Sequence, residues 1–248
     1  MDLEFYKPYF TRDFLMGPNS LRVLGELLDR NPLRLNADSL ILDLGCGTGL
    51  TSFALCRETG ANVLANDLWI SGEENAARFN AWGVGGKVTP VHENADHLNF
   101  DQETFDAVVS IDAYHYFAGS EGYFRQKILP FMKHGSVALL GVPGIREAYD
   151  TRTMELLSPW LGDEAGLFRS ARQWKQILGE DPDAYSAEVF ELNCFDSAWQ
   201  DWLAMDNEYA QGDRVHWESI IRPYTCFVGM IVRKKMTACR HADMLPAL

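Results

Sequence analysis

The sequence predicts an α/β protein built on a doubly wound, mostly parallel sheet. Apolar segments of strand length recur at 40–44, 62–66, 88–92, 105–111 and 137–142, and stretches with helical periodicity separate them. This alternation is typical of right-handed βαβ units, which place their strands in parallel. A second observation is the set of three alternating glycines, Gly45, Gly47 and Gly49, directly after the first strand. Glycines permit a sharp turn and a close approach of backbone to a ligand.

The N-terminal 19 residues are rich in aromatic side chains. They predict either an arm packed on the core or a flap over the ligand, with Phe14 to Pro18 near the glycine turn. Ser20 is a predicted N-cap for a helix over 21–29, which Asn31-Pro32 ends.

Local signals delimit the elements of the central segment. The helix after the glycine turn stops at Gly60, and Ser71 with Glu74 forms a capping box for the next helix. Ser120 is predicted to cap a further helix that Pro130 stops, and residues 133–135 are predicted to form a turn before the fifth strand.

The pattern changes after Pro143-Gly144. Residues 145–185 predict a helical lid, followed by a strand near 188–193, a helix over 197–210, a strong strand at 225–232 and a loose tail of about a dozen residues. We expect one domain over 1–248, with an N-terminal arm and helix (1–30), a cofactor-binding core (35–143), a lid (145–210) and a terminal strand (225–234).

Composition excludes several classes of function. The formal charge of −13 argues against nucleic acid and anionic membranes as partners, since both need a basic surface. The five cysteines are Cys46, Cys56, Cys194, Cys226 and Cys239; they are irregularly spaced, without a C-x-x-C pair. They predict reduced thiols in the cytoplasm and no metal site. No signal peptide or membrane span is visible.

The glycine turn has the form G-x-G-x-G, and Leu50 stands where a dinucleotide fingerprint needs its third glycine. Asp43 precedes the first glycine by two residues. A carboxylate facing a pyrophosphate repels it, whereas a cationic ligand gains from it. This favours a ligand such as S-adenosyl-L-methionine, which carries an ammonium and a sulfonium.

The segment Asp43-Leu44-Gly45-Cys46-Gly47-Thr48-Gly49 resembles the first motif of the class I S-adenosylmethionine-dependent methyltransferases. It is most similar to the small-molecule branch that includes ubiquinone- and menaquinone-biosynthesis enzymes, over about 35–145. The resemblance implies a Rossmann-like sheet of seven strands, with the last strand, Thr225–Val232, antiparallel.

The resemblance also assigns cofactor contacts. It implies that Asp67, at the end of the second strand, binds both ribose hydroxyls and that Leu68, helped by Trp69, covers the adenine. The third motif departs from the family pattern, so either Asn94 or Asp96 accepts from the adenine amino group. The cofactor-binding set is Asp43, Gly45, Cys46, Gly47, Thr48, Gly49, Asp67, Leu68, Asn94, Ala95, Asp96 and Asp112.

The family places residues beside the transferred methyl group after the fourth strand. His115 is the first candidate for a general base, as a histidine with an unshifted pKa near neutrality, and Tyr114 is a further catalytic candidate. Tyr116 is either a substrate contact or part of an aromatic helix start packed on the core.

We expect the acceptor pocket to come from the lid. Tyr149, Trp160 and Trp174 are candidates, together with one helix face formed by Trp199, Trp202, Asp206 and Tyr209. Simple core packing of these tryptophans is the alternative.

The predicted function is methyl transfer from S-adenosylmethionine to a small-molecule acceptor, an enzyme activity of the general class of methyltransferases. Two alternatives stay open at this point: a protein methyltransferase, and a non-catalytic S-adenosylmethionine-binding or regulatory module without an acceptor cavity. The oligomeric state is open.

Overall fold

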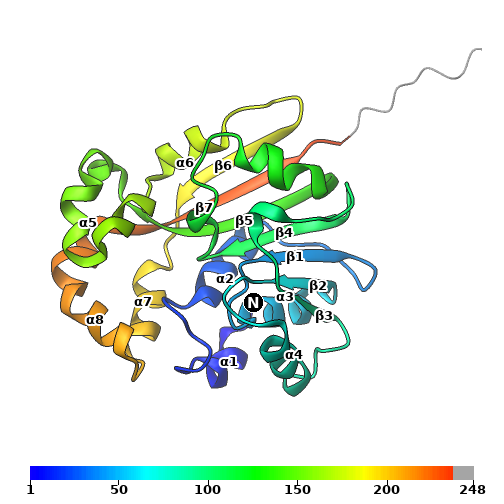
Figure 1. Ribbon diagram of the computed structural model, residues 1–248, viewed down its shortest axis with the longest axis horizontal. Coiled ribbons are helices and arrows are strands. Elements are labelled where there is room, and N and C mark those ends of the chain that lie inside the picture. Colours follow the sequence, from blue (N-terminus) through cyan, green and yellow to red (C-terminus); the bar gives the residue numbers. More distant parts are fainter. Residues whose placement is uncertain (237–248) are drawn as a thin grey trace, which may run out of the picture.

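The computed structural model describes residues 1–236, whose core is a single seven-stranded sheet (Figure 1). The strand order across the sheet is β3-β2-β1-β4-β5-β7-β6. The strands are β1 (Leu40–Leu44), β2 (Asn62–Asn66), β3 (Val88–Val91), β4 (Phe105–Ile111), β5 (Met132–Ile145), β6 (Tyr185–Glu191) and β7 (Thr225–Lys234).

The direction of the strands confirms the predicted fold class. β1 pairs in parallel with both β2 and β4, β2 with β3, and β4 with β5. The last strand, β7, lies between β5 and β6 and is antiparallel to both. The carboxyl ends of β1, β2 and β4 therefore meet at one edge of the sheet, where doubly wound folds bind their ligands.

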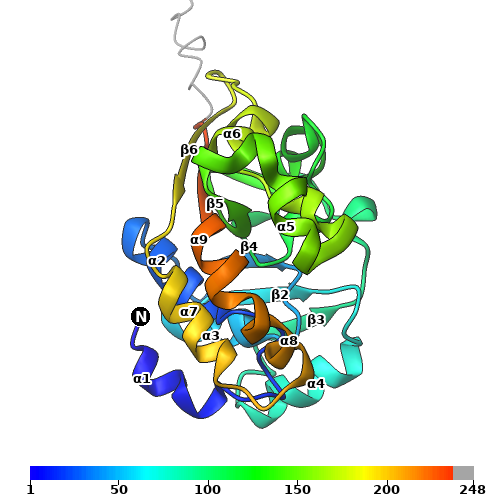
Figure 2. The ribbon, with the colours of Figure 1, turned by 90° about the vertical axis from the view of Figure 1, so that its left-hand side faces the viewer.

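Helices cover both faces of the sheet and extend beyond one end of it (Figures 1 and 2). In Figure 1, α2, α3 and α4 lie below the sheet and α6 lies above it, while α5, α7 and α8 gather on the left. The helices are α1 (Leu3–Tyr6), α2 (Ser20–Arg30), α3 (Leu50–Thr59), α4 (Gly72–Ala81), α5 (Thr153–Leu161), α6 (Ala171–Leu178), α7 (Phe195–Leu203), α8 (Glu208–His216) and α9 (Arg222–Tyr224).

Successive residues of the inner strands enter two separate cores, because side chains alternate across a strand. Ile41, Ala107 and Val109 pack with the apolar faces of α2 and α3. Leu42 and Val108 face the opposite side and pack with Trp174 of α6 and its neighbours. Both faces are buried, as the near-continuous apolar strands require.

Several helix boundaries follow from the predicted signals. The capping box of Ser71 and Glu74 is present, and Gly60 ends α3 in the left-handed conformation. The predicted cap at Ser20 is wrong by one residue, because the side chain of Asn19 accepts the hydrogen bond from the backbone N–H of Leu21 (3.0 Å).

The prediction for 120–135 is wrong in two respects. Ser120 caps no helix; a short π-helical turn, Phe124–Ile128, runs directly into a 3₁₀ turn that contains Pro130. Residues 133–135 lie inside β5 rather than before it, where the pairing with β4 skips several residues and Gly135 has a positive φ of 79°. The turn signal reflects this bulge in a continuous strand.

The helix predicted over 197–210 is also wrong. It is two helices, α7 and α8, and Asp206 lies in the exposed connection between them. Neither Asp196 nor Ser197 caps α7, which begins at Phe195 without a side-chain cap. The strand predicted at 188–193 begins earlier, at Tyr185.

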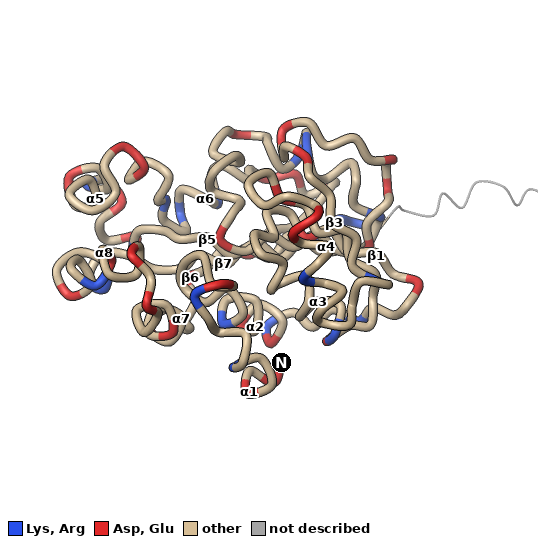
Figure 3. The backbone as a smooth tube through the Cα atoms, turned by 60° about the horizontal axis from the view of Figure 1, so that its bottom comes forward, with Lys and Arg blue, Asp and Glu red and all other residues tan. Residues whose placement is uncertain are grey.

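Acidic and basic residues are interleaved along the backbone, with acidic ones spread over α4, α5, α7 and α8 (Figure 3). Across the part of the chain that the structure describes, we find no helix with the length and apolarity that crossing a bilayer demands. Cys239 and the predicted loose tail lie outside the described residues.

Candidate functional site

A cavity of about 300 Å³ lies at the carboxyl ends of β1, β2 and β4. Four chain segments supply most of its wall: the N-terminal arm, the glycine turn, the residues after β2 and the residues after β4. Its lining consists of Phe14, Leu15, Met16, Gly17, Pro18, Ser20, Gly45, Cys46, Gly47, Thr48, Leu50, Thr51, Asn66, Asp67, Leu68, Trp69, Glu93, Asn94, Ala95, Ile111, Asp112, Ala113, Tyr116 and Phe117.

The glycine turn is shaped by positions that exclude any side chain. Gly45 has φ of 77°, and a Cβ there would lie 2.2 Å from the Cβ of Ala113. Gly49 has φ of 85°, and its Cβ would strike the ring of Phe79. Gly45 thus brings the backbone close to the chain after β4, whereas Gly49 begins α3 and does not line the cavity.

The carboxylate of Asp67 lies at the cavity wall and joins two loops. Its Oδ2 accepts from the backbone N–H of Gly47 (2.8 Å), and its Oδ1 accepts from Trp69 and Ile70 (2.7 and 2.9 Å). A carboxylate has about four lone-pair positions, so Asp67 retains capacity for ligand hydroxyls. Its backbone bonds fix its orientation, as the predicted ribose contact requires.

Asp43 does not reach the cavity. It is fully buried behind the glycine turn, and its Oδ2 accepts from the hydroxyls of Thr51 and Ser52 (both 2.6 Å). Burial raises the pKa of this carboxyl to about 6, against the effect of these two hydroxyl donors. The structure therefore gives Asp43 the task of holding the first turn of α3 beneath the glycine turn, rather than a direct contact with a cationic ligand.

Asp112 is one of three acidic residues that line the cavity, together with Asp67 and Glu93. It follows β4 with a positive φ of 58°, a conformation that costs energy for a residue other than glycine. No donor among residues 1–236 bonds to its carboxylate, and burial raises its pKa to about 7. Its Oδ2 lies against Gly17 of the N-terminal arm, where a Cβ would stand 3.2 Å away.

The N-terminal arm closes one side of the cavity. The hydroxyl of Thr48 donates to the carbonyl oxygen of Phe14 (2.7 Å), and the sulfur of Met16 lies over Gly47. The predicted proximity of Phe14 to Pro18 to the glycine turn is confirmed.

The segment after β3 presents Asn94 and Ala95 to the cavity, whereas Asp96 is exposed outside it. The Oδ1 of Asn94 already accepts from the backbone N–H of Asp96 (2.8 Å) and keeps one further lone pair. The geometry favours Asn94 over Asp96 as the predicted adenine partner. Leu68 and Trp69 stand half exposed at the same end.

The residues after β4 divide between cavity and core. Tyr116 lines the cavity, but Tyr114 is buried among the rings of Phe117, Tyr123 and Trp174 and does not. His115 is buried behind Tyr116 (ring centroids 4.1 Å apart), and its Nδ1 has no partner within the described residues. Burial and the charge of Arg169 lower the pKa of His115 to about 3, so the expectation of a pKa near neutrality is wrong.

The expected acceptor pocket in the lid does not form around the cavity. Tyr149, Trp160, Trp174, Trp199 and Trp202 all lie away from its lining. Trp199 and Trp202 are buried core residues, as the alternative interpretation expected.

The acid among these tryptophans is Asp213 rather than Asp206. Its two carboxylate oxygens accept from the indole N–H groups of Trp160 and Trp202 (both 2.8 Å). The predicted shared face is wrong, because Asp206 and Tyr209 are exposed. Asp213 therefore ties three helices together instead of forming a binding site.

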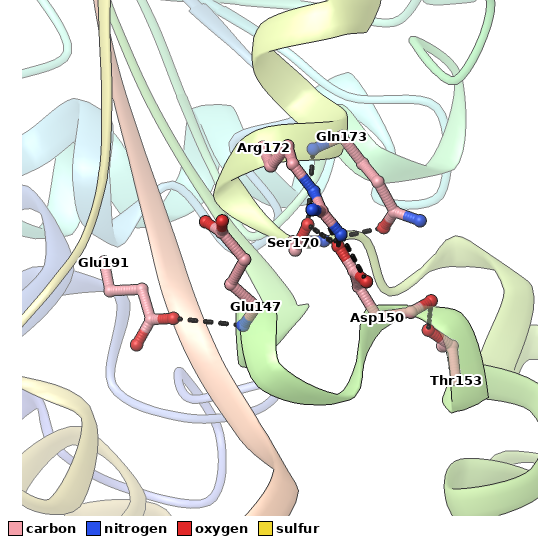
Figure 4. Close-up of polar contacts among 7 residues, drawn as sticks. All are labelled: Glu147, Asp150, Thr153, Ser170, Arg172, Gln173 and Glu191. Atoms are coloured by element: carbon pink, nitrogen blue, oxygen red, sulfur yellow. Dashed lines mark hydrogen bonds and ion pairs between the residues drawn. The ribbon is translucent and has the colours of Figure 1, made fainter.

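The lid contains a second carboxylate that ties separate segments together (Figure 4). Asp150 lies before α5 and accepts from the guanidinium of Arg172 (2.6 and 2.8 Å) and the hydroxyl of Ser170 (2.9 Å), both on or beside α6.

Sequence reasoning missed several lining residues. Ser20, Asn66, Glu93 and Phe117 reach the cavity through the close approach of four loops. The position of Asn66 and Glu93 at or just after the ends of the predicted strands β2 and β3 is the signal that could have found them.

Part of the chain is similar to a known family. Residues 41–133 match the model of a methyltransferase domain. A stretch of 100 residues, 39% of this chain, is 32% identical to the sterol 24-C-methyltransferase of Yarrowia lipolytica. The chain spans only about a quarter of the length of that relative.

Solved structures share the fold over most of the chain. Geranyl diphosphate C-methyltransferase from Streptomyces coelicolor superimposes with a TM-score of 0.67 at 15% identity, over 88% of this chain and 79% of its own. Phosphoethanolamine N-methyltransferase 2 of Haemonchus contortus gives 0.65 at 15% identity, over 94% of this chain and 57% of its own. Both structures hold S-adenosylhomocysteine.

The fold and the cavity define a Rossmann-like protein with a nucleotide-type site at the carboxyl edge of its sheet. Residues 41–133 match the methyltransferase-domain model, and the fold is that of the class I S-adenosylmethionine-dependent methyltransferases. S-Adenosylmethionine is the cofactor of that class. The narrower likeness to the ubiquinone and menaquinone branch stays a prediction.

Proposed function

We propose that this protein transfers the methyl group of S-adenosylmethionine to a small-molecule acceptor. The observation that carries the proposal is the arrangement of two carboxylates in one cavity. Asp67 is held by three backbone N–H groups yet keeps room for hydroxyls, and Asp112 has no partner among the described residues. An adenosyl ligand with hydroxyls at one end and two positive charges at the other suits both.

Different lining residues would contact different parts of the cofactor. Asp67 would accept from the ribose hydroxyls, Asn94 and Leu68 would contact the adenine, and the turn from Gly45 to Thr48 would lie against the methionine portion. Asp112, strained and unpartnered, would face the cationic end. Attraction to that charge would repay the cost of holding this carboxylate in a cavity.

When bound, S-adenosylmethionine supplies an electrophilic methyl group that an acceptor attacks in line with the departing sulfur. The protein's part is to align the two reactants and exclude water, which accounts for much of the lowering of such a barrier. The N-terminal arm over the glycine turn and the rings of Tyr116 and Phe117 would form the enclosing wall.

We further propose a reducing compartment such as the cytoplasm. The four cysteines within residues 1–236 are free thiols, and three of them are buried. The formal charge of −13 also argues against a nucleic-acid partner.

An acceptor screen that measures release of S-adenosylhomocysteine tests the activity. We expect turnover with at least one class of small molecule and none with protein or RNA substrates. Methylation of a protein substrate alone would overturn the small-molecule assignment. Binding of S-adenosylmethionine without turnover in any pool, including whole-cell extract, would support a regulatory module instead.

A further inference from the structure

Large apolar side chains are unusually concentrated at the mouth of the cofactor cavity. Among the described residues, nine large apolar side chains are strongly exposed, and four of these line this one cavity. They are Met16 (53% exposed), Leu68 (50%), Trp69 (65%) and Tyr116 (46%). Single exposed apolar residues are ordinary, but a contiguous group around a cavity marks a binding surface. We call these four residues the apolar rim.

Three separate segments build the apolar rim. Met16 comes from the N-terminal arm, Leu68 and Trp69 follow β2, and Tyr116 follows β4. The rings of Trp69 and Tyr116 meet edge to face with centroids 5.0 Å apart, so these two segments form one continuous surface. Met16 stands on the other side, with its sulfur over Gly47.

The size of the cavity suits the cofactor alone, so a second ligand would lie at the apolar rim. About 300 Å³ is at the lower end of the range for small-molecule sites. The adenosyl and methionine groups of the cofactor would occupy this cavity. Leu68 would be partly covered by the adenine, while Met16, Trp69 and Tyr116 would remain at the mouth, where an acceptor must approach.

Charge argues against a second polar ligand at this place. The outer wall formed by Met16, Trp69, Tyr116 and Phe117 carries no formal charge. With a formal charge of −13, the whole chain would be repelled by anionic lipid. A continuous apolar surface next to the cofactor site therefore points to a free apolar molecule.

We propose that the acceptor is a molecule with a hydrocarbon or aromatic body that lies on the apolar rim and presents its reacting atom inward to the cofactor. This inference rests on the proposed function and names the substrate class for it. Polar contacts at the rim are few, so burial of the acceptor's apolar surface supplies most of its affinity.

The first experiment measures binding without turnover. The uncharged fluorescent probe N-phenyl-1-naphthylamine is titrated into the full chain saturated with S-adenosylhomocysteine. We expect Met16→Ser and Tyr116→Ser each to weaken probe binding at least fivefold, because each removes apolar contact area. Met154→Ser and Tyr209→Ser alter comparably exposed side chains away from the cavity and should change it less than twofold.

The second experiment measures transfer itself. Alcohols, phenols and amines are assayed as acceptors in series that differ only in alkyl chain length, with S-adenosylhomocysteine release as the readout. We expect kcat/KM to rise about fourfold per added methylene until the rim is covered, as apolar burial predicts. The slope should become shallower in Tyr116→Ser but not in Tyr209→Ser.

The outcomes separate the inference from the proposed function. Failure of S-adenosylhomocysteine to bind the wild-type chain removes the proposed function. If it binds, the inference is overturned by equal probe binding in rim and control variants, or by transfer to small polar acceptors with a flat chain-length series. It is also overturned if neutral phosphatidylcholine vesicles bind through the rim and the free probe does not.

Discussion

The cofactor half and the lid half of the molecule use their acidic side chains for different purposes. In the cofactor half, Asp67 accepts from backbone N–H groups of two loops, and Asp112 faces the cavity without a partner. In the lid half, Asp150 and Asp213 bond to side chains of separate segments and hold them together. A carboxylate that accepts from backbone N–H groups at a cavity wall can still bind a ligand. A carboxylate whose oxygens accept from buried side chains stabilises the fold instead.

Among substitutions of these acidic residues, we expect the largest effect on cofactor binding at Asp67. Asp67→Ala should weaken binding of S-adenosylmethionine by a factor of about one hundred, about 2.7 kcal/mol, because charge-assisted hydrogen bonds are lost and Gly47 is released. Isothermal titration calorimetry measures this, with circular dichroism to confirm the fold. An affinity within threefold of wild type would show that the carboxylate does not hold the ribose.

Asp213 should show the opposite pattern. Asp213→Ala leaves the indole N–H groups of Trp160 and Trp202 without an acceptor and should lower the free energy of unfolding by about 2–4 kcal/mol. Cofactor affinity should stay within threefold of wild type. Asp206→Ala is the matched control: it removes an exposed carboxylate nearby and should change stability by less than about 0.5 kcal/mol. Equal losses of unfolding free energy for Asp213→Ala and Asp206→Ala in chemical denaturation would contradict a stabilising role for Asp213.

Asp112→Asn should weaken cofactor binding and stabilise the cofactor-free protein. The folded-state pKa of Asp112, about 7, exceeds that of the unfolded chain, so the folded protein holds a proton that the unfolded chain has lost. The free energy of unfolding should therefore fall as pH rises from about 4 to 7, and the full cost is present above pH 7. Asn removes this cost and tolerates the positive φ.

We expect Asp112→Asn to stabilise the cofactor-free protein at pH 8 by about 1–4 kcal/mol and to weaken cofactor binding about tenfold. Denaturation curves at pH 4 and pH 8 measure the first effect, with little change expected at the lower pH. A destabilised variant at pH 8 would show that the carboxylate has a partner in the folded state.

The smallest effect should come from His115. Its ring does not line the cavity, and its pKa of about 3 makes it a weak base. His115→Gln should lower kcat less than tenfold and leave the pH profile of kcat/KM unchanged. A loss of a thousandfold or more, with a shifted profile, would make this histidine the base after all.

The cofactor half and the lid half also differ in how well their structure could be predicted from the sequence. In the cofactor half, local signals determine local structure: the strand at 40–44, the capping box of Ser71 and the glycine turn occur as predicted. Asp67 could be placed at the cavity because it stands at the end of a strand. The seven-stranded topology followed from the same motif.

The lid half was not predictable in this way, because its contacts join residues far apart in the chain. A stripe of Trp199, Trp202, Asp206 and Tyr209 has helical spacing, but the chain leaves the helix at Leu203, so Asp206 leaves the shared face. Nothing local distinguishes Asp213, which pairs with an indole 53 residues away, from Asp206.

Asp43 and His115 illustrate a limit within the cofactor half itself. Their positions in the sequence put both residues next to segments that line the cavity, but burial decides which way each side chain points. The side chain of Asp43 lies beneath the glycine turn and accepts from Thr51 and Ser52, and the ring of His115 lies behind Tyr116.

Calorimetric titration of the wild-type chain with S-adenosylmethionine, and in parallel with NAD, tests the central claim most directly. We predict saturable one-to-one binding of S-adenosylmethionine in the micromolar range and no detectable heat from NAD. Leu50 stands where a dinucleotide fingerprint needs its third glycine, and the acids Asp67 and Asp112 line the cavity. Binding of NAD with no binding of S-adenosylmethionine would contradict the assignment of the cavity.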